Sequence, residues 1–227
     1  MRPSVTCVCD CINPLQTQTR FVILMHPKEY KKEKNGTGHM TKLQLENSEI
    51  IVGVDFTHNK RVNEILNDEN CESFLLYPGA DSFNLSVREK SETHTFLGTK
   101  PYLFILDGTW PCARKMLKLS KNLQQLQRVS FDNTITSKFL IKQQPEALCL
   151  STIESVFTVL NLLNASGFEQ CNTKDFLVPF EKMISSQIDY MLDPNNQEND
   201  STIKRELLPK TNYKKSPLKS VVFEVGD

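Results

Sequence analysis

Four short polar segments hold the residues of this chain that are best suited to chemistry. One of them, Asp107–Trp110, follows a run of apolar residues and joins a carboxylate to the only tryptophan of the chain. A carboxylate can accept a proton or hold an amino group, and a tryptophan ring can pack on the ring or alkyl chain of a ligand. The structural alternatives are a turn with a helix cap for Asp107–Thr109 and a core anchor for Trp110.

The other three polar segments also follow predicted strands. His26–Glu29 follows the first apolar run, Tyr77–Asp81 follows the third, and Ser151–Thr152 follows the last. Because ligands of open α/β sheets bind outside the carboxyl ends of the strands, we expect these segments to gather at one edge of a sheet. The structural alternatives are a strand-end histidine for His26 and a solvated loop charge for Glu29.

The elements that must position these segments alternate along the chain. Apolar runs predict strands at residues 20–25, 48–54, 73–77, 102–106, 128–131 and 147–150. Helical spacing predicts helices at residues 38–46, 59–67, 109–126, 151–163 and 178–192. Pro111 suits the first turn of the third helix, and Ser151–Glu154 reads as a capping box that opens the fourth. Strands that are apolar throughout and separated by helices predict an α/β fold, with a mainly parallel sheet flanked by helices.

One domain accounts for most of the chain. A chain of 227 residues can build one sizeable core, and we expect this core in residues 1–192. Residues 193–200 are polar and read as a linker, and a basic segment follows them. This polar and basic C-terminal tail, residues 193–227, includes Val221–Val225, which could either pair with the sheet edge or stay loose.

Composition narrows the classes of function. Lys and Arg together number 27, as do Asp and Glu, so any nucleic acid must be bound by a local basic patch. Seven cysteines, an odd number, and no apolar leader after Met1 predict a reduced, cytoplasmic protein. No apolar run is long enough to cross a membrane, so no membrane association is expected. The absence of a GxGxxG segment after a strand and of a P-loop argues against both kinds of nucleotide site.

Six short segments occur in an order that resembles one family. They are Cys9–Cys11, His26–Glu29, Asn35–Gly38, Leu76–Gly79, Asp107–Trp110 and Leu150–Glu154. Each segment is short, but the ordered set resembles the DTW-domain family of tRNA-uridine aminocarboxypropyltransferases. The resemblance implies a SPOUT-like fold, in which a mainly parallel sheet carries a deep trefoil knot towards its C-terminal part.

The resemblance also implies a donor, a reaction and a set of site residues. S-adenosylmethionine would donate its 3-amino-3-carboxypropyl group to N3 of a tRNA uridine, and methylthioadenosine would leave. Asp107 would act as the general base or orient the amino group of the donor, and Trp110 would hold the aminocarboxypropyl arm. The expected cofactor-binding residues are Tyr77, Pro78, Gly79, Gly108, Thr109, Leu150, Ser151 and Thr152.

We expect basic residues to grip the RNA backbone, which would make binding strongly salt dependent. The candidates are His26, Lys28, Lys31, Lys32, Lys34, Arg114 and Lys142, with Lys115, Lys118 and Lys121 beyond Arg114. Family members tend to have arginines before the proline that matches Pro145, where this chain has Lys142, so a phosphate contact there would be less directional. The structural alternative for each lysine is a solvated face.

Three cysteines, Cys7, Cys9 and Cys11, stand close together near the start of the chain. Family members often carry a further CxxC pair upstream, which suggests a four-cysteine metal site, but only six residues precede Cys7 here. Three ligands fall short of a structural zinc site, so we expect reduced cysteines and no bound metal.

Two other functions stay open from the sequence. A SPOUT-type RNA methyltransferase would use the same donor but release S-adenosylhomocysteine, whereas an aminocarboxypropyltransferase releases methylthioadenosine. A non-catalytic RNA-binding protein would not bind the donor at all. Product analysis and donor binding therefore separate the three hypotheses.

Overall fold

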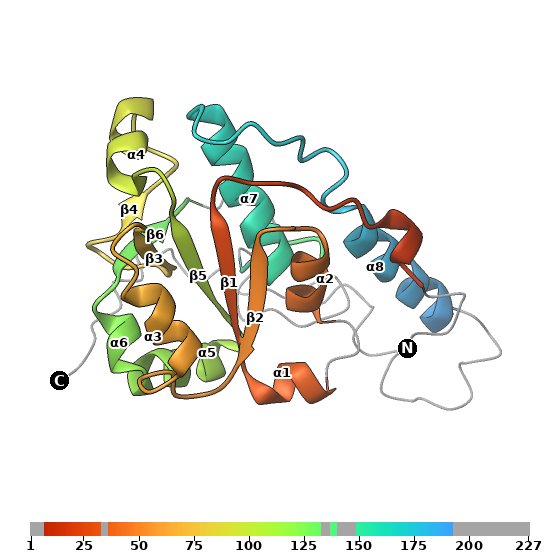
Figure 1. The fold of residues 1–227 in the computed structure, drawn as a ribbon. Helices are drawn as coiled ribbons and strands as arrows, with labels where there is room; N and C mark the ends of the chain where they lie inside the picture. The colour runs from red at the N-terminus through yellow and green to blue at the C-terminus, as the bar shows by residue number, and fades with distance from the viewer. Residues whose placement is uncertain (1–6, 33–35, 133–136, 140–148, 193–227) are drawn as a thin grey trace, which may run out of the picture.

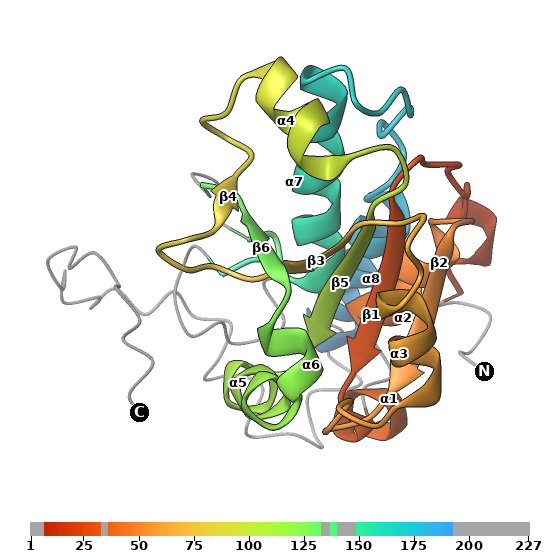
Figure 2. The same ribbon diagram turned by 60° about the vertical axis from the view of Figure 1, so that its left-hand side comes forward.

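A parallel sheet forms the centre of the fold. The computed structural model describes residues 7–32, 36–132, 137–139 and 149–192. The strands in this part are β1 (Arg20–Met25), β2 (Ser48–Val52), β3 (Ser73–Leu76), β4 (Phe83–Asn84), β5 (Tyr102–Asp107) and β6 (Gln127–Ser130). They lie in the order β2-β1-β5-β3-β6-β4, and all five pairings are parallel (Figure 1, Figure 2). The expected α/β class with a parallel sheet is confirmed.

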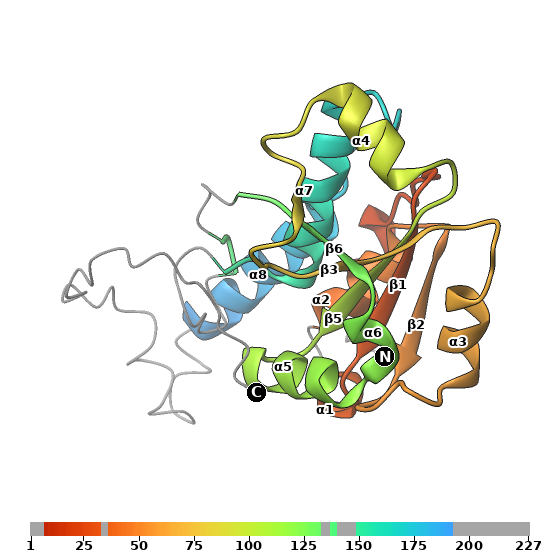
Figure 3. The same ribbon diagram turned by 90° about the vertical axis from the view of Figure 1, so that its left-hand side faces the viewer.

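Helices cover both faces of this sheet, which explains why its strands are apolar on both sides. They are the 3-10 helix η2 (Cys9–Cys11) and the α-helices α1 (Pro27–Lys32), α2 (Thr37–Leu43), α3 (Lys60–Leu66), α4 (Lys90–Leu97), α5 (Trp110–Leu119), α6 (Lys121–Gln124), α7 (Thr152–Ala165) and α8 (Val178–Leu192). Phe21 joins the core under α2, α7 and α8, whereas its neighbour Val22 joins the core under α3, α5 and α6 (Figure 3). No helix within the described residues is long and apolar enough to cross a membrane.

The chain leaves β1 and β5 on opposite faces of the sheet. The segment after β1 leads to α2, whose Met40 belongs to the first core, and the segment after β5 leads to α5, whose Met116 belongs to the second. The two strands pair along their whole length, from Arg20 opposite Tyr102 to Met25 opposite Asp107. A crevice is expected at the carboxyl ends of two neighbouring strands whose connections diverge in this way. The topology therefore places the candidate site beside Asp107.

A buried carboxylate fixes the N-terminus of α7. Glu154 accepts the Ser151 N–H at 2.9 Å, and its own N–H donates to the Ser151 hydroxyl oxygen, as the predicted capping box requires; the carboxylate also accepts from the Ser151 hydroxyl at 2.6 Å. The same carboxylate accepts from the Ser137 hydroxyl and the Lys138 N–H, both at 2.7 Å. Glu154 thus ties residues 137 and 138 to the start of α7, beside the cavity described below.

Most of the predicted elements are confirmed, but the helix predicted for residues 109–126 is wrong in its second half. β1 and α8 match the predicted ranges, and α5 begins after Thr109 with Pro111 in its first turn. The helix predicted for residues 109–126 instead ends at Leu119, and the separate helix α6 follows. Ser120 between them is buried, and its hydroxyl accepts the Phe56 N–H at 2.9 Å. A tertiary hydrogen bond therefore stabilises a bend that the helical spacing of apolar residues did not reveal.

The prediction also misses four short elements, η2, α1, α4 and β4, because runs of 3, 6, 8 and 2 residues show little periodicity. The strand predicted at residues 147–150 is wrong for Cys149 and Leu150, which line a cavity and belong to no strand of the described residues. Residues 147 and 148 lie outside the described residues, as does the tail 193–227. The domain boundary at residue 192 therefore stays a prediction.

The role of Glu154 can be tested by a substitution that keeps its size. In Glu154→Gln, an amide nitrogen replaces one acceptor oxygen and faces donors, and the charge that strengthens the remaining hydrogen bonds is lost. We expect the free energy of unfolding, measured by urea denaturation, to fall by roughly 2–4 kcal/mol.

Glu181→Gln is the matched control. Glu181 pairs with Lys138 Nζ at 2.8 Å, but the two side chains are 47% and 63% exposed. Because exposed ion pairs contribute little, this variant should lose less than about 1 kcal/mol. Equal losses in the two variants would show that the buried carboxylate does not organise the start of α7.

Candidate active site

A cavity of about 390 Å³ opens at the carboxyl edge of the sheet. Its wall is formed by the segments that follow β1, β3, β5 and β6, and by the start of α7. Figure 1 shows α1 and α5 at this edge of the molecule, where the strand arrows end. A cavity of this volume, at the carboxyl ends of parallel strands, is typical of small-molecule sites.

Seven of the eight residues expected to bind a cofactor line this cavity. They are Tyr77, Pro78, Gly108, Thr109, Leu150, Ser151 and Thr152. The eighth, Gly79, is not among its lining residues; a Cβ there would lie 2.8 Å from Arg128 Nη1, so this glycine lets the Arg128 side chain approach the backbone. Asp107 and Trp110, the expected catalytic residues, also line the cavity. The expected edge-of-sheet cluster thus forms, while the role of each residue stays a prediction.

The Asp107 carboxylate lies where three elements meet. Asp107 is 6% exposed at the end of β5, and its Oδ1 accepts a short hydrogen bond from Thr152 Oγ1 at the start of α7. A Cβ on Gly38 of α2 would overlap Asp107 Oδ2, so only glycine allows the carboxylate to lie there. Thr109 is the N-cap of α5, so the alternative of a turn with a helix cap describes the segment Asp107–Thr109 correctly, and the contact between Asp107 and Thr152 is additional to it.

Gly108 and Thr109 bring the N-terminus of α5 to the cavity. A Cβ on Gly108 would lie 3.2 Å from Cys112 Cβ and 3.4 Å from His26 Cβ, so glycine allows β1 and α5 to approach each other. Thr109 makes no side-chain capping bond, and its exposed side chain lines the cavity. Both α5 and α7 therefore present their N-termini to the cavity, and such N–H groups favour a negatively charged ligand group.

Trp110 and Tyr77 form the aromatic side of the cavity. Their rings meet edge to face with centroids 6.3 Å apart, and the Arg128 guanidinium lies 5.5 Å from the Tyr77 ring centroid. Burial raises the pKa of the Tyr77 phenol, while the nearby Arg128 and Arg114 act in the opposite direction. The phenol therefore stays protonated at neutral pH. Trp110 is half-buried and belongs to neither core of the described residues, so the core-anchor alternative is not favoured.

Glu29 is the most informative site residue that sequence reasoning missed. The interpretation of Glu29 as a solvated loop charge is wrong, because it is 8% exposed and lines the cavity from α1. Gly36 and Thr37, at the start of α2, line the same wall. Their position along the chain could have identified them, since all three residues lie between the end of β1 and the first turn of α2.

Basic residues expected to contact RNA lie on the helices that border the cavity. Lys28 and Lys31 of α1 and Arg114 of α5 are exposed. His26 is only 8% exposed and its Nδ1 accepts the Lys28 N–H at 3.1 Å, which supports the strand-end alternative for this ring. The candidates outside the described side chains are Lys32, Lys34 and Lys142.

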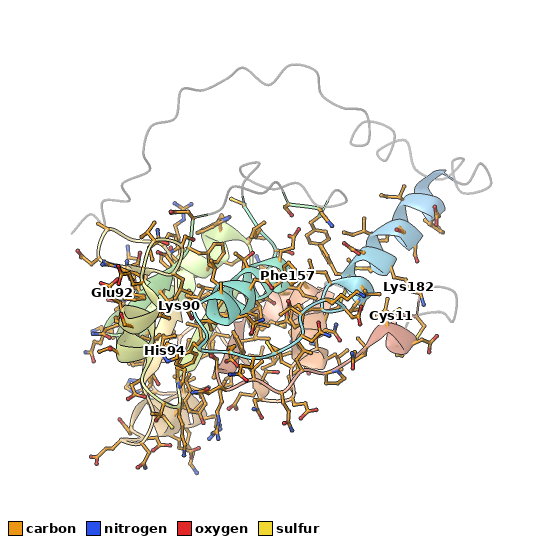
Figure 4. All side chains as sticks on the ribbon, turned by 90° about the horizontal axis from the view of Figure 1, so that it is seen from above. Cys11, Lys90, Glu92, His94, Phe157 and Lys182 are labelled. Carbon is orange, nitrogen blue, oxygen red and sulfur yellow. The ribbon has the colours of Figure 1, made fainter. Side chains whose placement is uncertain are left out.

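The N-terminal cysteines lie against α8. Figure 4 shows Cys11 close to Lys182 of α8, at the opposite end of the molecule from Lys90 and His94 of α4. The Cys9 N–H donates a hydrogen bond to the Cys7 sulfur, and this bond lowers the pKa of the Cys7 thiol. The described residues contain no group of three or more His, Cys, Asp or Glu side chains that could hold a metal ion. Absence of a metal stays a prediction.

Comparison with protein families tests the resemblance to the DTW-domain family that six short segments of the sequence suggested. The family model of the DTW domain matches residues 1–188. The chain belongs to the DTW domain family. This match covers the whole sheet and every described residue that lines the cavity, so the DTW domain contains the complete candidate site.

Three curated relatives of this DTW-domain chain carry the same name. A Drosophila melanogaster protein named tRNA-uridine aminocarboxypropyltransferase 2 is 32% identical over 172 residues, which are 72% of this chain and 64% of the relative. Proteins with the same name from Macaca fascicularis and Mus musculus are 25% and 24% identical over 195 residues, or 83% of this chain and 62% of each relative. The chain thus spans less than two thirds of the length of these relatives. No solved structure matches the chain.

The contact between Asp107 and Thr152 can be tested by removing one hydroxyl. Thr152→Val leaves the buried carboxylate without this donor, at a position where the new methyl group adds almost no volume. We expect the free energy of unfolding, measured in urea, to fall by about 1–3 kcal/mol.

Thr158→Val is the control on the same helix. Thr158 Oγ1 donates to the Glu154 carbonyl at 3.0 Å, a neutral bond to a carbonyl that already takes part in the helix. This variant should lose less than about 1 kcal/mol. If both variants lose the same free energy, the link from Asp107 to α7 is no stronger than an ordinary helical hydroxyl contact.

Proposed function

We propose that this protein transfers the 3-amino-3-carboxypropyl group of S-adenosylmethionine to N3 of a tRNA uridine. The observation that carries the proposal is the Asp107–Trp110 segment, which lines the cavity at the switch between β1 and β5 in a chain of the DTW family. The shared name of its curated relatives supports the same reaction.

The cavity has the features that S-adenosylmethionine requires. Its volume of about 390 Å³ falls within the range of small-molecule sites, and its aromatic side can receive an adenine ring or a sulfonium. The N-termini of α5 and α7 can receive the donor carboxylate. The carboxylates of Glu29 and Asp107, which both line the cavity, can receive the positively charged groups. These matches support the assignment of Tyr77, Pro78, Gly108, Thr109, Leu150, Ser151 and Thr152 to the donor site.

The proposed reaction needs positioning and a proton acceptor. S-adenosylmethionine supplies an electrophilic γ-carbon next to a sulfonium. N3 of the uridine forms the new C–N bond to this carbon, and the electrons of the broken C–S bond stay on the sulfur of methylthioadenosine. Asp107 accepts the N3 proton, and the hydrogen bond from Thr152 fixes the position of one of its carboxylate oxygens. Trp110 holds the aminocarboxypropyl arm against this carboxylate.

The RNA would approach over α1 and α5. Lys28, Lys31 and Arg114 are exposed on these two helices, which also contribute Glu29 and Trp110 to the cavity wall. Phosphate contacts there would hold the backbone while one base enters the cavity. Because N3 is hidden in a paired uridine, the target must be unpaired or flipped out. The remaining candidates His26, Lys32, Lys34 and Lys142 complete the proposed RNA contacts, and Gly79 completes the proposed donor site.

A SPOUT-like fold with a trefoil knot, no resident metal and a cytoplasmic location complete the proposal. A parallel sheet whose ligand cavity is built by the segments after β3, β5 and β6 and by the start of α7 supports this fold. Most of the connection from β6 to α7 lies outside the described residues.

Donor binding can be followed through the only tryptophan. Trp110 is half-buried and lines the cavity, so a ligand there should change its emission. We expect S-adenosylmethionine, without added metal, to change Trp110 fluorescence along a saturation curve and to raise the melting temperature with concentration. A folded sample with neither change at millimolar donor would contradict the proposal, and a melting shift without a fluorescence change would place the donor elsewhere.

Asp107→Asn tests the proton acceptor. Asparagine can still accept the Thr152 hydrogen bond through its amide oxygen, so the fold should persist. At saturating donor, we expect methylthioadenosine release to fall about 10²- to 10⁴-fold, the usual contribution of general-base catalysis. Raising the pH should restore part of the rate, because N3 loses its proton without help at higher pH.

The outcome separates the two roles that Asp107 could have. Near-normal turnover at saturating donor, with weakened donor affinity and no effect of pH, would remove the base and leave Asp107 as an anchor for the amino group. Near-normal turnover with normal affinity would leave only the contact to Thr152.

A further inference from the structure

Two arginines lie over tyrosine rings in the part of the chain that the structure describes. Arg20 lies 5.4 Å from the ring centroid of Tyr102 and also donates to its hydroxyl at 2.7 Å. Arg128 lies 5.5 Å from the ring centroid of Tyr77, yet its guanidinium has no carboxylate or other hydrogen-bond acceptor among the described residues. Arg128 is half-buried, and its side-chain nitrogen atoms are reached by solvent. Its N–H donors are therefore open to an anionic ligand.

The Arg128 guanidinium lies beside the cavity. Arg128 belongs to β6 and pairs with Leu75 of β3, two residues before Tyr77. Its side chain reaches the segment after β3, because a Cβ on Gly79 would lie only 2.8 Å from its Nη1. Tyr77 and Pro78 of the same segment line the cavity. The missing side chain of Gly79 thus lets the guanidinium lie directly against a wall of the candidate site.

A second guanidinium approaches the same wall from α5. Arg114 follows Trp110 by four residues, so the two side chains lie on one face of the helix. Trp110 meets Tyr77 edge to face at 6.3 Å, and both Arg114 and Arg128 act to lower the pKa of the Tyr77 phenol. Arg114 is exposed and forms no ion pair with a described carboxylate. One aromatic pair of the cavity therefore has a positive side chain near it from α5 and another from β6.

Two kinds of anion take part in the proposed reaction, the donor carboxylate and the phosphates of the RNA. The N-termini of α5 and α7 can receive the carboxylate. The planar fork of a guanidinium matches the geometry of a phosphate, and the hydrogen bonds are charge-assisted. A ribose joins each base to its phosphates, so a base that enters the cavity brings a phosphate to the edge of the cavity. This phosphate has the charge and the position that the two arginines require.

We propose that Arg128, together with Arg114, holds the phosphate of the nucleotide whose base enters the cavity. This inference rests on the proposed function and adds Arg128 to its RNA contacts, as a residue that positions the target nucleotide. The contact with the Tyr77 ring and the space above Gly79 hold the guanidinium in place before RNA binds. Because the side chain is already ordered, the phosphate contact costs little conformational entropy.

The first experiment compares small ligands on the unsubstituted protein. Uridine, uridine 5′-monophosphate and uridine 3′-monophosphate are titrated separately, and binding is followed through the emission of Trp110. We expect the better of the two monophosphates to bind roughly tenfold or more tightly than uridine, because it adds charge-assisted hydrogen bonds to the same base. This comparison does not depend on whether a variant folds.

The second experiment removes the charge at Arg128. The affinity for labelled, unmodified tRNA is measured by fluorescence anisotropy at several salt concentrations. Arg128→Gln should weaken tRNA binding roughly tenfold, and the slope of log affinity against log salt should become shallower by roughly 0.7 to 0.9, the loss of one phosphate contact. Arg128→Lys keeps the charge without the fork, so it should keep the slope and lose less affinity. The affinity for S-adenosylmethionine should change less than about twofold in both variants.

Arg20→Gln is the matched control. It loses the same charge and the same kind of contact with a tyrosine ring, but Arg20 starts β1, at the opposite end of this strand from the cavity. The tRNA affinity and its salt slope should therefore stay unchanged.

The outcomes distinguish this inference from the proposed function. Equal affinities for uridine and both monophosphates, or no emission change with any of them while tRNA binds, would overturn the inference. An unchanged salt slope in a folded Arg128→Gln variant, or the same change in Arg20→Gln, would also overturn it. Weaker S-adenosylmethionine binding with an unchanged tRNA slope would assign Arg128 to the donor carboxylate instead. All these results leave methylthioadenosine release with tRNA intact as evidence for the proposed function, whereas an unsubstituted protein that binds no tRNA would end both.

Discussion

The hydrogen bond between Asp107 and Thr152 joins parts of the chain that are 45 residues apart. It connects the end of the central strand β5 to the start of α7, and the missing side chain of Gly38 lets α2 close over the same carboxylate. A buried carboxylate is tolerated only where donors or positive groups surround it. The position of α2, α7 and the cavity between them therefore depends on this one group.

Acidic and basic side chains occupy different positions around the site. Glu29 and Asp107 line the cavity, and Lys28 and Lys31 of α1 and Arg114 of α5 are exposed. A chain with no net charge can thus offer a negative cavity to a small cation and a positive rim to a polyanion. The proposed reaction needs both surfaces, because it brings a cationic donor and an RNA together.

Sequence reasoning predicted the sheet and the centre of the site well. Apolar runs identify strands reliably when both faces are covered, and β1 was predicted to the residue. Polar residues after such strands must lie at the carboxyl edge, which is why Asp107, Trp110 and Thr152 were expected together before the structure placed them. The capping box of α7 was also visible, because Ser151 and Glu154 have the required spacing.

Features that depend on tertiary contacts were not predictable. Glu29 read as a loop charge because α1 has only six residues and shows no amphipathic period. The bend at Ser120 depends on the Phe56 N–H, which is 64 residues away along the chain, so the residues around Ser120 do not predict the bend. The contact of Asp107 with Thr152 was not predictable for a similar reason, since Thr152 lies 45 residues away on another helix.

The central claim is that this cavity directs the donor to give up its aminocarboxypropyl group and keep its methyl group. The most direct measurement uses S-adenosylmethionine labelled with different isotopes in the methyl group and in the aminocarboxypropyl carbons, incubated with the purified protein and unmodified tRNA. We predict that only the aminocarboxypropyl label enters the tRNA, on a uridine nucleoside, and that the methyl label appears in methylthioadenosine. Methyl label in the tRNA, with release of S-adenosylhomocysteine, would contradict the account.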